Sequence, residues 1–290
     1  MRVLVTGSFG QVGHCLTEQL KAVTSEVKAI DRTVLDITDR NEVFRLVQEF
    51  KPTVIINAAA YTAVDKAEEE VDLSYAINRN GPKYLAEAAQ SIGAAILHIS
   101  TDYVFAGNKQ GLYQEDDVTD PQSVYGASKL AGEQEVINSC EKHIILRTAW
   151  VFGEFGNNFV KTMIRLGKER DSLGIVGDQF GGPTYAGDIA AALINFAQKI
   201  TEDASFEFGI YHFSGLPHVS WYEFAETIFS KAVKQGVIES APKLVPLTTP
   251  EYPTPAKRPE NSKLDTDKVC NVLGIEPSDW IAALDDLSAY

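Results

Sequence analysis

The feature that most constrains the fold of this chain is a glycine-rich turn near its N-terminus. A short β-rich run at 2–6 breaks into Gly7, Gly10 and Gly13, and helical periodicity follows at 14–22. The spacing is G-x-x-G-x-x-G, a variant of the G-x-G-x-x-G pattern. A strand, glycine turn and helix in this order bring backbone N–H groups and a helix N-terminus to a pyrophosphate. The turn therefore predicts a dinucleotide site, although glycines also form ordinary turns.

Apolar strands and amphipathic helices then alternate along the first half of the chain. The predicted strands after the first are Val27–Ile30, Thr53–Ile56, Ala95–Ser100 and His143–Arg147, and the predicted helices after the first are Asn41–Phe50, Leu73–Ser91 and Val124–Ser139. This alternation predicts an α/β fold, a Rossmann-type doubly wound parallel sheet with right-handed connections. Beyond Arg147 the pattern loosens into loop-rich, aromatic-rich sequence. We expect a smaller, discontinuous C-terminal substrate domain, with the dinucleotide domain at 1–149 plus about 186–214 and the substrate domain at about 150–185 and 215–290.

Two further segments bear on the cofactor. The second strand ends in Asp31, which lies where an acidic residue would meet the adenosine ribose and favours NAD. Arg32 beside it favours acceptance of a 2′-phosphate as well, and a solvated turn pair is the alternative for both. Ala58, Ala59 and Ala60 follow the third strand. Their small side chains would let a cofactor pass close to the backbone, or they simply end a buried strand.

The candidate chemistry lies at Thr101, Tyr125 and Lys129. On a helix, the spacing of four places Lys129 one turn beyond Tyr125, on the same face. A nearby ammonium favours the phenolate and is expected to lower the phenol pKa toward the range useful for proton transfer. Thr101 ends the predicted strand before them and is placed to hydrogen-bond the same substrate oxygen. The alternative is that a Tyr and a Lys four residues apart merely cover surface.

Composition excludes several classes of protein. The formal net charge of −14 disfavours a nucleic-acid partner. No run of about 18 apolar residues and no leader-like segment is present, so we expect a cytoplasmic protein without a membrane partner. The three cysteines and five histidines show no spacing typical of disulfide frameworks or zinc sites, and no metal site is predicted.

Longer sequence strings carry a family resemblance. The glycine turn, Thr101 and Tyr125-x-x-x-Lys129 resemble the extended short-chain dehydrogenase/reductase superfamily. Six further segments resemble its dTDP-4-dehydrorhamnose reductase branch, over about residues 1–285: 57–68, 100–105, 147–152, 156–163, 178–184 and 252–262.

The resemblance implies a set of contacts for each ligand. A nicotinamide cofactor, NADPH or NADH, would contact Gly10, Gln11, Val12, Asp31, Asp36, Ile37, Ala60, Tyr61, Thr62 and Lys129. The sugar of a sugar-nucleotide substrate would lie against Thr101, Asp102, Tyr125 and Trp150, with Tyr103 beside them. We add Asn158, Lys161 and Arg258 for the diphosphate, because an anionic substrate needs donors that an acidic chain otherwise lacks. Each of these three is alternatively a residue that anchors a loop or covers surface.

Two positions depart from the family pattern. Some members carry acidic residues that help to bind Mg²⁺ at a dimer interface, and here the corresponding positions are Cys15 and Gly187. Neither supplies the carboxylate oxygen that Mg²⁺ prefers. We therefore expect no requirement for Mg²⁺, and a monomer or weak homodimer.

The implied activity is NAD(P)H-dependent reduction of the C4 keto group of dTDP-4-dehydro-L-rhamnose. Other enzymes that act on nucleoside diphosphate sugars use the same fold. A 4,6-dehydratase places Asp-Glu after the threonine, whereas this chain has Asp102-Tyr103. A 4-epimerase, or a reductase of another 4-keto-6-deoxysugar nucleotide, remains open. A non-catalytic nucleotide-binding subunit, like the relatives that partner methionine adenosyltransferase, has no need of a tuned phenol.

Overall fold

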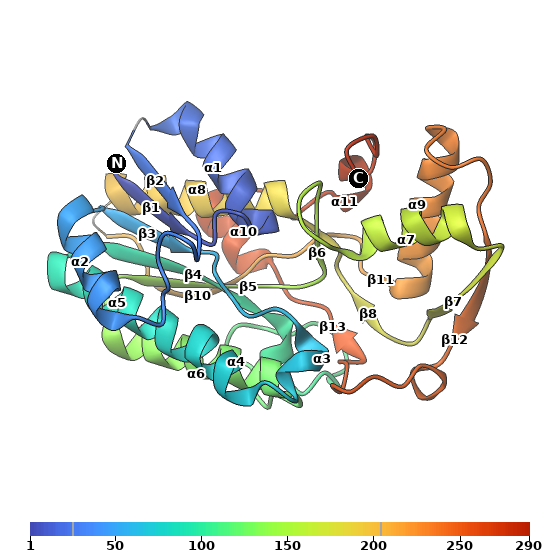
Figure 1. The fold of residues 1–290 in the computed structure, drawn as a ribbon, viewed down its shortest axis with the longest axis horizontal. Helices are drawn as coiled ribbons and strands as arrows, with labels where there is room; N and C mark the ends of the chain where they lie inside the picture. The colour runs from blue at the N-terminus through green and yellow to red at the C-terminus, as the bar shows by residue number, and fades with distance from the viewer. Residues whose placement is uncertain (25, 204) are drawn as a thin grey trace.

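The computed structural model describes residues 1–24, 26–203 and 205–290, and its largest element is a six-stranded parallel sheet (Figure 1). The strand order is β2-β1-β3-β4-β5-β10, and every neighbouring pair is parallel. The strands are β1 (Val3–Thr6), β2 (Val27–Ile30), β3 (Val54–Asn57), β4 (Ala95–Thr101), β5 (His143–Thr148) and β10 (Gly209–His212). The predicted doubly wound parallel sheet is confirmed.

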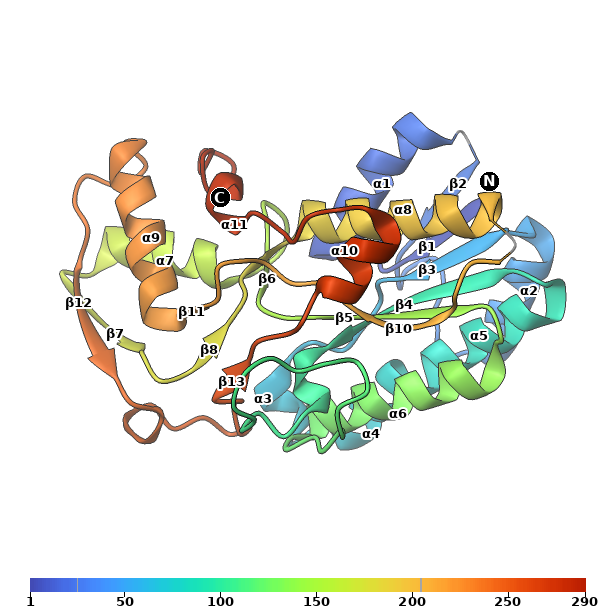
Figure 2. The ribbon, with the colours of Figure 1, turned by 180° about the vertical axis from the view of Figure 1, so that it is seen from behind.

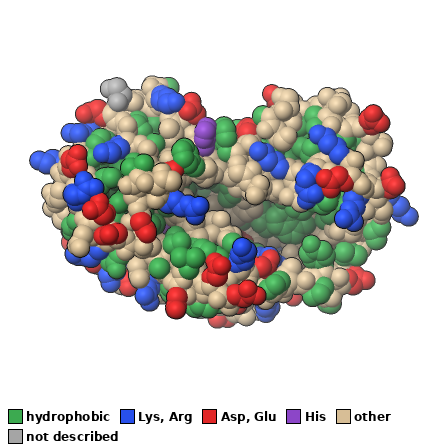
Figure 3. All heavy atoms as spheres, viewed as in Figure 1, with side chains coloured by type: hydrophobic (Ala, Val, Ile, Leu, Met, Phe, Trp, Pro, Cys, Tyr) green, Lys and Arg blue, Asp and Glu red, His purple; other side chains and the backbone are tan. Residues whose placement is uncertain are grey.

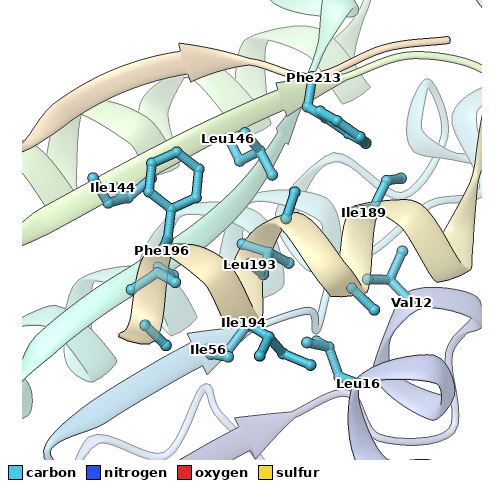
Figure 4. Packing of buried hydrophobic residues seen from close by; sticks show 14 of the residues in the cluster. Val12, Leu16, Ile56, Ile144, Leu146, Ile189, Leu193, Ile194, Phe196 and Phe213 are labelled. Carbon is cyan, nitrogen blue, oxygen red and sulfur yellow. The ribbon is translucent and has the colours of Figure 1, made fainter. Parts of the chain in front are cut away.

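Helices cover both faces of this sheet, as Figures 1 and 2 show from opposite sides. One face carries α1 (Gln11–Val23) and α8 (Ala186–Glu202), and the other carries α2 (Arg40–Phe50), α5 (Gly81–Ile92) and α6 (Val124–Ser139). In Figure 4, the apolar face of α8 packs against the side chains of the strands and of α1. The strand order reverses between β1 and β3, and a doubly wound sheet binds its ligand at the carboxyl ends of the strands at such a point.

The predicted helix Leu73–Ser91 is wrong in one respect, because the structure divides it. Helix α4 (Val71–Tyr75) passes into a π-helical segment, Ala76–Asn80, before α5 begins. Pro82 lies in the first turn of α5, where its missing N–H costs least. The Asn78 side chain bonds the backbone N–H and carbonyl of Tyr61, so this interruption holds the loop after β3. Such π-segments occur often at functional sites.

The remaining elements form a smaller part beside the carboxyl ends of the strands. Two helices, α7 (Phe159–Glu169) and α9 (Trp221–Lys234), pack around a cluster that includes Phe152, Phe224 and Trp280. The strands and short helices of this part are β6 (Val151–Phe152), β7 (Ser172–Val176), β8 (Phe180–Gly181), β9 (Thr184–Tyr185), β11 (Val219–Ser220), β12 (Lys243–Leu247), β13 (Asn261–Ser262) and α11 (Trp280–Ala283).

The chain leaves the sheet after β5, returns through α8 and β10, and leaves it again. Helix α10 (Asp267–Leu273) lies in the range predicted for the substrate domain. Its Val269 and Leu273 nevertheless pack into the hydrophobic cluster that the sheet forms with α1 and α8. The domain boundaries themselves stay a prediction. Within the described ranges, no helix combines the length and the apolar character needed to cross a membrane.

Candidate functional site

The glycine turn after β1 is built so closely that side chains do not fit at two of its glycines. Gly7 has a φ of +74°, and a Cβ there would lie 2.6 Å from the backbone nitrogen of Ala59. A Cβ on Gly13 would lie 2.0 Å from the carbonyl oxygen of Gly7. The turn therefore folds tightly over the first turn of α1 and against the loop after β3.

The N-terminus of α1 is open to a ligand. Gly10 occupies the cap position, no side chain caps the helix, and its first turn contains no acidic residue. The first N–H groups of a helix need acceptors and carry a partial positive charge, so they attract an anionic group. Gln11, Val12 and Gly13 lie in this first turn, where their backbone N–H groups are available to a pyrophosphate.

A cleft of about 850 Å³ extends from the glycine turn across the carboxyl ends of β1, β2 and β3. Among the predicted cofactor residues, its lining contains Gly7, Gly10, Asp31, Arg32, Asp36, Ile37, Ala58, Ala59, Ala60, Tyr61 and Thr62. The carboxylate of Asp31 accepts hydrogen bonds from the backbone and hydroxyl of Thr33, which lower its pKa and fix it at the end of β2. The cleft, the close glycine turn and the uncapped helix together fit a dinucleotide.

Tyr125 and Lys129 lie on one face of α6, as the spacing predicts. The Ser123 hydroxyl caps this helix by accepting a hydrogen bond from the Gly126 N–H at 3.2 Å. A Cβ on Gly126 would lie 2.2 Å from the Tyr103 carbonyl oxygen, so α6 packs directly on the segment that follows β4. Thr101, the last residue of β4, is buried and lies near enough to Tyr125 for its hydroxyl to lower the pKa of the phenol.

The prediction that Lys129 lowers the pKa of the Tyr125 phenol is wrong for the protein without its ligands. Burial raises the pKa of Tyr125, and the interaction with Thr101 offsets only part of this effect. Lys129 is itself buried, which lowers the pKa of its amine to about 8, and its Nζ donates to the Ile99 carbonyl oxygen at 2.6 Å. With a pKa of about 8 the amine is still mostly charged at neutral pH, yet its charge does not offset the effect of burial on the Tyr125 phenol.

Asp102 is a buried carboxyl beside this pair. Its oxygens accept hydrogen bonds from the hydroxyls of Thr101, at 2.9 Å, and Ser262. Burial nevertheless dominates and raises the pKa of Asp102 to about 6. Because Ser262 belongs to β13, this contact joins the end of β4 to the smaller part of the molecule.

A second cleft, of about 430 Å³, opens beside Tyr103 between the two parts of the molecule, where Figure 3 shows a hollow with hydrophobic side chains on its wall. Trp150 lines it and stacks on Trp221 with ring centroids 3.6 Å apart. Trp150 also has a φ of +49°, a conformation that is strained for a bulky residue and occurs most often at functional sites. The described lining also includes Asp65, Phe159, Leu173, Gly174, Gln179, Tyr252, Arg258 and Ser262.

The structure separates the three residues predicted for the diphosphate. Arg258 lines the second cleft, where its guanidinium donates to an Asp65 oxygen at 2.6 Å and to the Tyr103 hydroxyl at 3.2 Å. Asn158 instead caps α7, and its amide donates to Gln11 Oε1 at 3.0 Å. The Lys161 amine donates to the backbone carbonyl of Glu154. Asn158 and Lys161 are both absent from the described lining of the second cleft, because their side chains hold the loop before α7.

Sequence reasoning missed several residues at the site, among them Trp221, Asp65 and His98. Asp65 was part of a string used for the resemblance, but its ion pair with Arg258 joins residues 193 positions apart. His98 lies in the centre of β4, beside Lys129. A polar residue within an otherwise apolar strand was the available signal for His98.

The positions expected for magnesium ligands lie near the start of α1 and of α8. Cys15 is buried, and burial, with a smaller contribution from the charge of Glu154, raises the pKa of its thiol to about 11. Gly187 offers only its backbone carbonyl, which accepts from Gln19. The Glu154 carboxylate accepts from the Tyr185 hydroxyl at 2.6 Å. Across 1–24, 26–203 and 205–290, no group of three or more His, Cys, Asp or Glu is arranged to hold a metal ion.

Known proteins resemble this chain over its full length. The family model described as RmlD substrate binding domain matches residues 1–289. The dTDP-4-dehydrorhamnose reductase of Aggregatibacter actinomycetemcomitans is 54% identical over 290 residues, which cover 100% of this chain and 99% of that protein. A crystal structure of dTDP-4-dehydrorhamnose reductase from Clostridium acetobutylicum superposes with a TM-score of 0.90 at 44% identity, covering 98% of this chain and 97% of the other. The corresponding Bacillus anthracis structure, in complex with NADP, has a TM-score of 0.89 at 41% identity and the same coverage.

The model match and the identity both extend over nearly the whole chain, so they apply to the sheet and to the smaller part alike. The three relatives named above are dTDP-4-dehydrorhamnose reductases, and this chain belongs with them to the RmlD substrate binding domain family.

Proposed function

We propose that this protein uses NADPH or NADH to reduce the C4 keto group of dTDP-4-dehydro-L-rhamnose to dTDP-L-rhamnose. The observation that carries the proposal is the position of Thr101, Tyr125 and Lys129. Thr101 ends β4, and Tyr125 and Lys129 lie on α6. The Tyr125 ring contacts that of Tyr103, which lines the second, aromatic-lined cleft, with ring centroids 5.4 Å apart. Ser128, next to Lys129, bonds the Asn78 side chain that holds Tyr61 in the cleft that fits a dinucleotide. A carbonyl held there would face a proton donor on one side and the cofactor on the other.

The proposed proton donor is Tyr125. Its raised pKa keeps the phenol protonated at neutral pH, which suits a residue that must give a proton to the developing alkoxide. The Thr101 hydroxyl would hydrogen-bond the same carbonyl oxygen and orient it. When bound, the reduced nicotinamide supplies the hydride that C4 receives. The substrate oxygen thereby becomes a hydroxyl, and Tyr125 recovers its proton from solvent.

The proposed cofactor site follows the first cleft. The N–H groups of Gln11, Val12 and Gly13 would bind the pyrophosphate, and Lys129 would bind the nicotinamide ribose. Asp31 is placed to accept a hydrogen bond from an adenosine ribose hydroxyl, and the exposed Arg32 beside it to pair with a 2′-phosphate. The NADP found with the Bacillus anthracis relative supports a phosphorylated cofactor. We propose that both cofactors are accepted.

The proposed sugar-nucleotide site is the second cleft. Trp150 and Trp221 provide flat apolar surfaces, and Arg258 provides a guanidinium in a chain whose net charge is −14. Such a group can bind a diphosphate with two hydrogen bonds. The sugar would lie toward Thr101, Asp102 and Tyr125. Asn158 and Lys161 are proposed only as supports of the loop before α7.

A stoichiometric assay tests the proposal. The purified protein is incubated with NADPH and dTDP-4-dehydro-L-rhamnose, and the oxidised cofactor and dTDP-L-rhamnose are both quantified. One mole of cofactor consumed for each mole of dTDP-L-rhamnose formed supports the reductase. In a parallel incubation of dTDP-L-rhamnose with NAD⁺, formation of its C4 epimer without net change of the cofactor, and with no turnover of the keto sugar, would indicate a 4-epimerase. No conversion, with cofactor binding retained, would indicate the non-catalytic nucleotide-binding subunit.

A further inference from the structure

A row of buried polar side chains crosses the sheet beneath the proposed catalytic residues. Thr6 of β1, Asn57 of β3 and His98 of β4 are paired neighbours in register, and Lys129 of α6 follows at the end of the row. Their exposed fractions are only 1%, 0%, 0% and 2%, in that order. Buried polar atoms require partners, so the hydrogen bonds in this row determine which atoms carry protons.

The orientation of the Asn57 amide is fixed by its neighbours. The backbone N–H of Ala59 is 3.1 Å from Asn57 Oδ1, and this N–H is only a donor. The Thr6 hydroxyl lies 2.7 Å from the same oxygen. The other amide atom, Nδ2, is therefore the nitrogen, and it lies 3.0 Å from His98 Nδ1. Because the amide nitrogen only donates, His98 Nδ1 must accept and carries no proton.

The proton of the neutral His98 ring is consequently on Nε2. This atom faces the Lys129 amine, with 3.4 Å between His98 Nε2 and Lys129 Nζ. A neutral amine has a lone pair that can accept from the Nε2–H. An ammonium group has none, so two N–H groups would point at each other. A doubly protonated ring is disfavoured by burial, which by itself lowers the pKa of His98 well below the ordinary histidine value.

We propose that His98 is a positioning residue that presents its Nε2–H to Lys129 and so favours the neutral form of that amine. Asn57 fixes the tautomer, and the row Thr6-Asn57-His98 thereby acts on the catalytic pair without touching a ligand. The sheet register places these three side chains beside one another, so the effect follows from backbone geometry.

Other charged or titratable groups also face Lys129. Glu133, one turn further along α6, favours the charged amine. The charge of Glu133 is held in a bidentate ion pair by Arg147 of β5, which reduces its effect on Lys129. Tyr125 lies one turn before Lys129, and the buried carboxyl of Asp102 lies beside Tyr125 beyond the end of β4. His98 acts in the opposite direction to Glu133, because its Nε2–H points at Lys129 Nζ and disfavours a further proton there.

The consequence concerns the proton donor, and this part rests on the proposed function. By lowering the pKa of Lys129, the His98 Nε2–H narrows the pH range in which a charged amine stabilises the phenolate, so Tyr125 keeps its proton to higher pH. In His98→Gln, the side-chain amide can rotate to present its oxygen to the amine. Lys129 would then stay charged, and Tyr125 would lose its proton at lower pH.

The tautomer can be measured without any activity. The full-length protein is labelled with ¹⁵N-histidine, and long-range ¹H–¹⁵N spectra are recorded from about pH 6 to pH 9, a range that spans the ordinary histidine pKa and its alkaline side. The His98 signal is assigned by its loss in His98→Gln. We expect an unprotonated Nδ1, a protonated Nε2 and no titration over this range. A protonated Nδ1, or a ring that titrates there, would overturn the inference even if the enzyme is a reductase.

The pH profile of kcat for NADPH consumption provides the second test. We expect its alkaline limb in His98→Gln to move to lower pH by about one unit, because the charged amine stabilises the phenolate. His143→Gln is the matched control, since His143 begins β5 at the end of the sheet away from Thr101, and its ring bonds the Cys140 carbonyl. An alkaline limb unchanged in His98→Gln would contradict the inference. If His98→Gln does not fold, single substitutions of the other four histidines assign the His98 signal by elimination, and the tautomer measurement on the unmodified protein is then the decisive test.

Discussion

The pair formed by Glu133 and Arg147 anchors the catalytic helix to the sheet. Tyr125, Lys129 and Glu133 follow one another at intervals of four residues on α6, so all three face the same way. The Arg147 guanidinium donates to both Glu133 oxygens, at 3.0 Å and 2.7 Å, and it also donates to the Glu115 carbonyl. The exposed fractions of the two side chains are 3% for Arg147 and 1% for Glu133.

Glu133→Ala is expected to destabilise the protein strongly. The substitution leaves a guanidinium buried with a single remaining carbonyl partner, and breaking a buried ion pair in this way costs about 3–5 kcal/mol. With an unfolding entropy of about 2.1 cal/mol/K per residue, that loss corresponds to a decrease in Tm of roughly 5–8 °C for a chain of 290 residues. The activity at a temperature well below Tm should fall as well, because α6 positions Tyr125.

Differential scanning calorimetry measures this change in Tm. The control is Glu169→Ala, which removes an exposed i,i+4 ion pair with Arg165 and is expected to change stability by no more than ~0.5 kcal/mol. The double variant Glu133→Leu/Arg147→Met should recover much of the lost stability, since an apolar pair leaves no buried charge. A Tm for Glu133→Ala equal to that of the control would refute the reasoning that this pair anchors α6.

Four further outcomes are expected. Tyr125→Phe should lower kcat by about 10²–10⁴ while cofactor binding, measured by calorimetry, stays nearly intact; a variant with more than half of the original kcat would exclude Tyr125 as proton donor. Arg32→Ala should raise KM for NADPH and leave that for NADH unchanged; equal changes would show that Arg32 does not bind the 2′-phosphate. Arg258→Ala should raise KM for the sugar nucleotide by about 10- to 100-fold with little change in kcat, whereas its exposed neighbour Lys257→Ala should not. Activity and sedimentation should be the same in EDTA and in millimolar Mg²⁺; a dimer that dissociates on chelation would show that acidic residues such as Glu154 bind the metal.

The sequence by itself determined the features that depend on local backbone geometry. The strands of the first half and two of its four predicted helices, Asn41–Phe50 and Val124–Ser139, lie within a residue or two of their predicted ends, because hydrophobic periodicity reports directly on burial. The glycine turn was recognisable for the same reason, since Gly7 has a positive φ and Gly13 lies against the Gly7 carbonyl oxygen within the same turn. The spacing of Tyr125 and Lys129 places them on one helical face in any fold that keeps α6.

The tertiary structure decided the contacts and protonation states that join distant segments. The ion pair of Asp65 with Arg258 and the bond of Asn158 to Gln11 connect residues more than 140 positions apart, and local pattern carries no information on such pairs. The same holds for His98, whose role depends on the register of three strands. Burial, rather than the neighbouring lysine, sets the pKa of Tyr125. Desolvation depends on everything packed around a group, so only the assembled fold determines it.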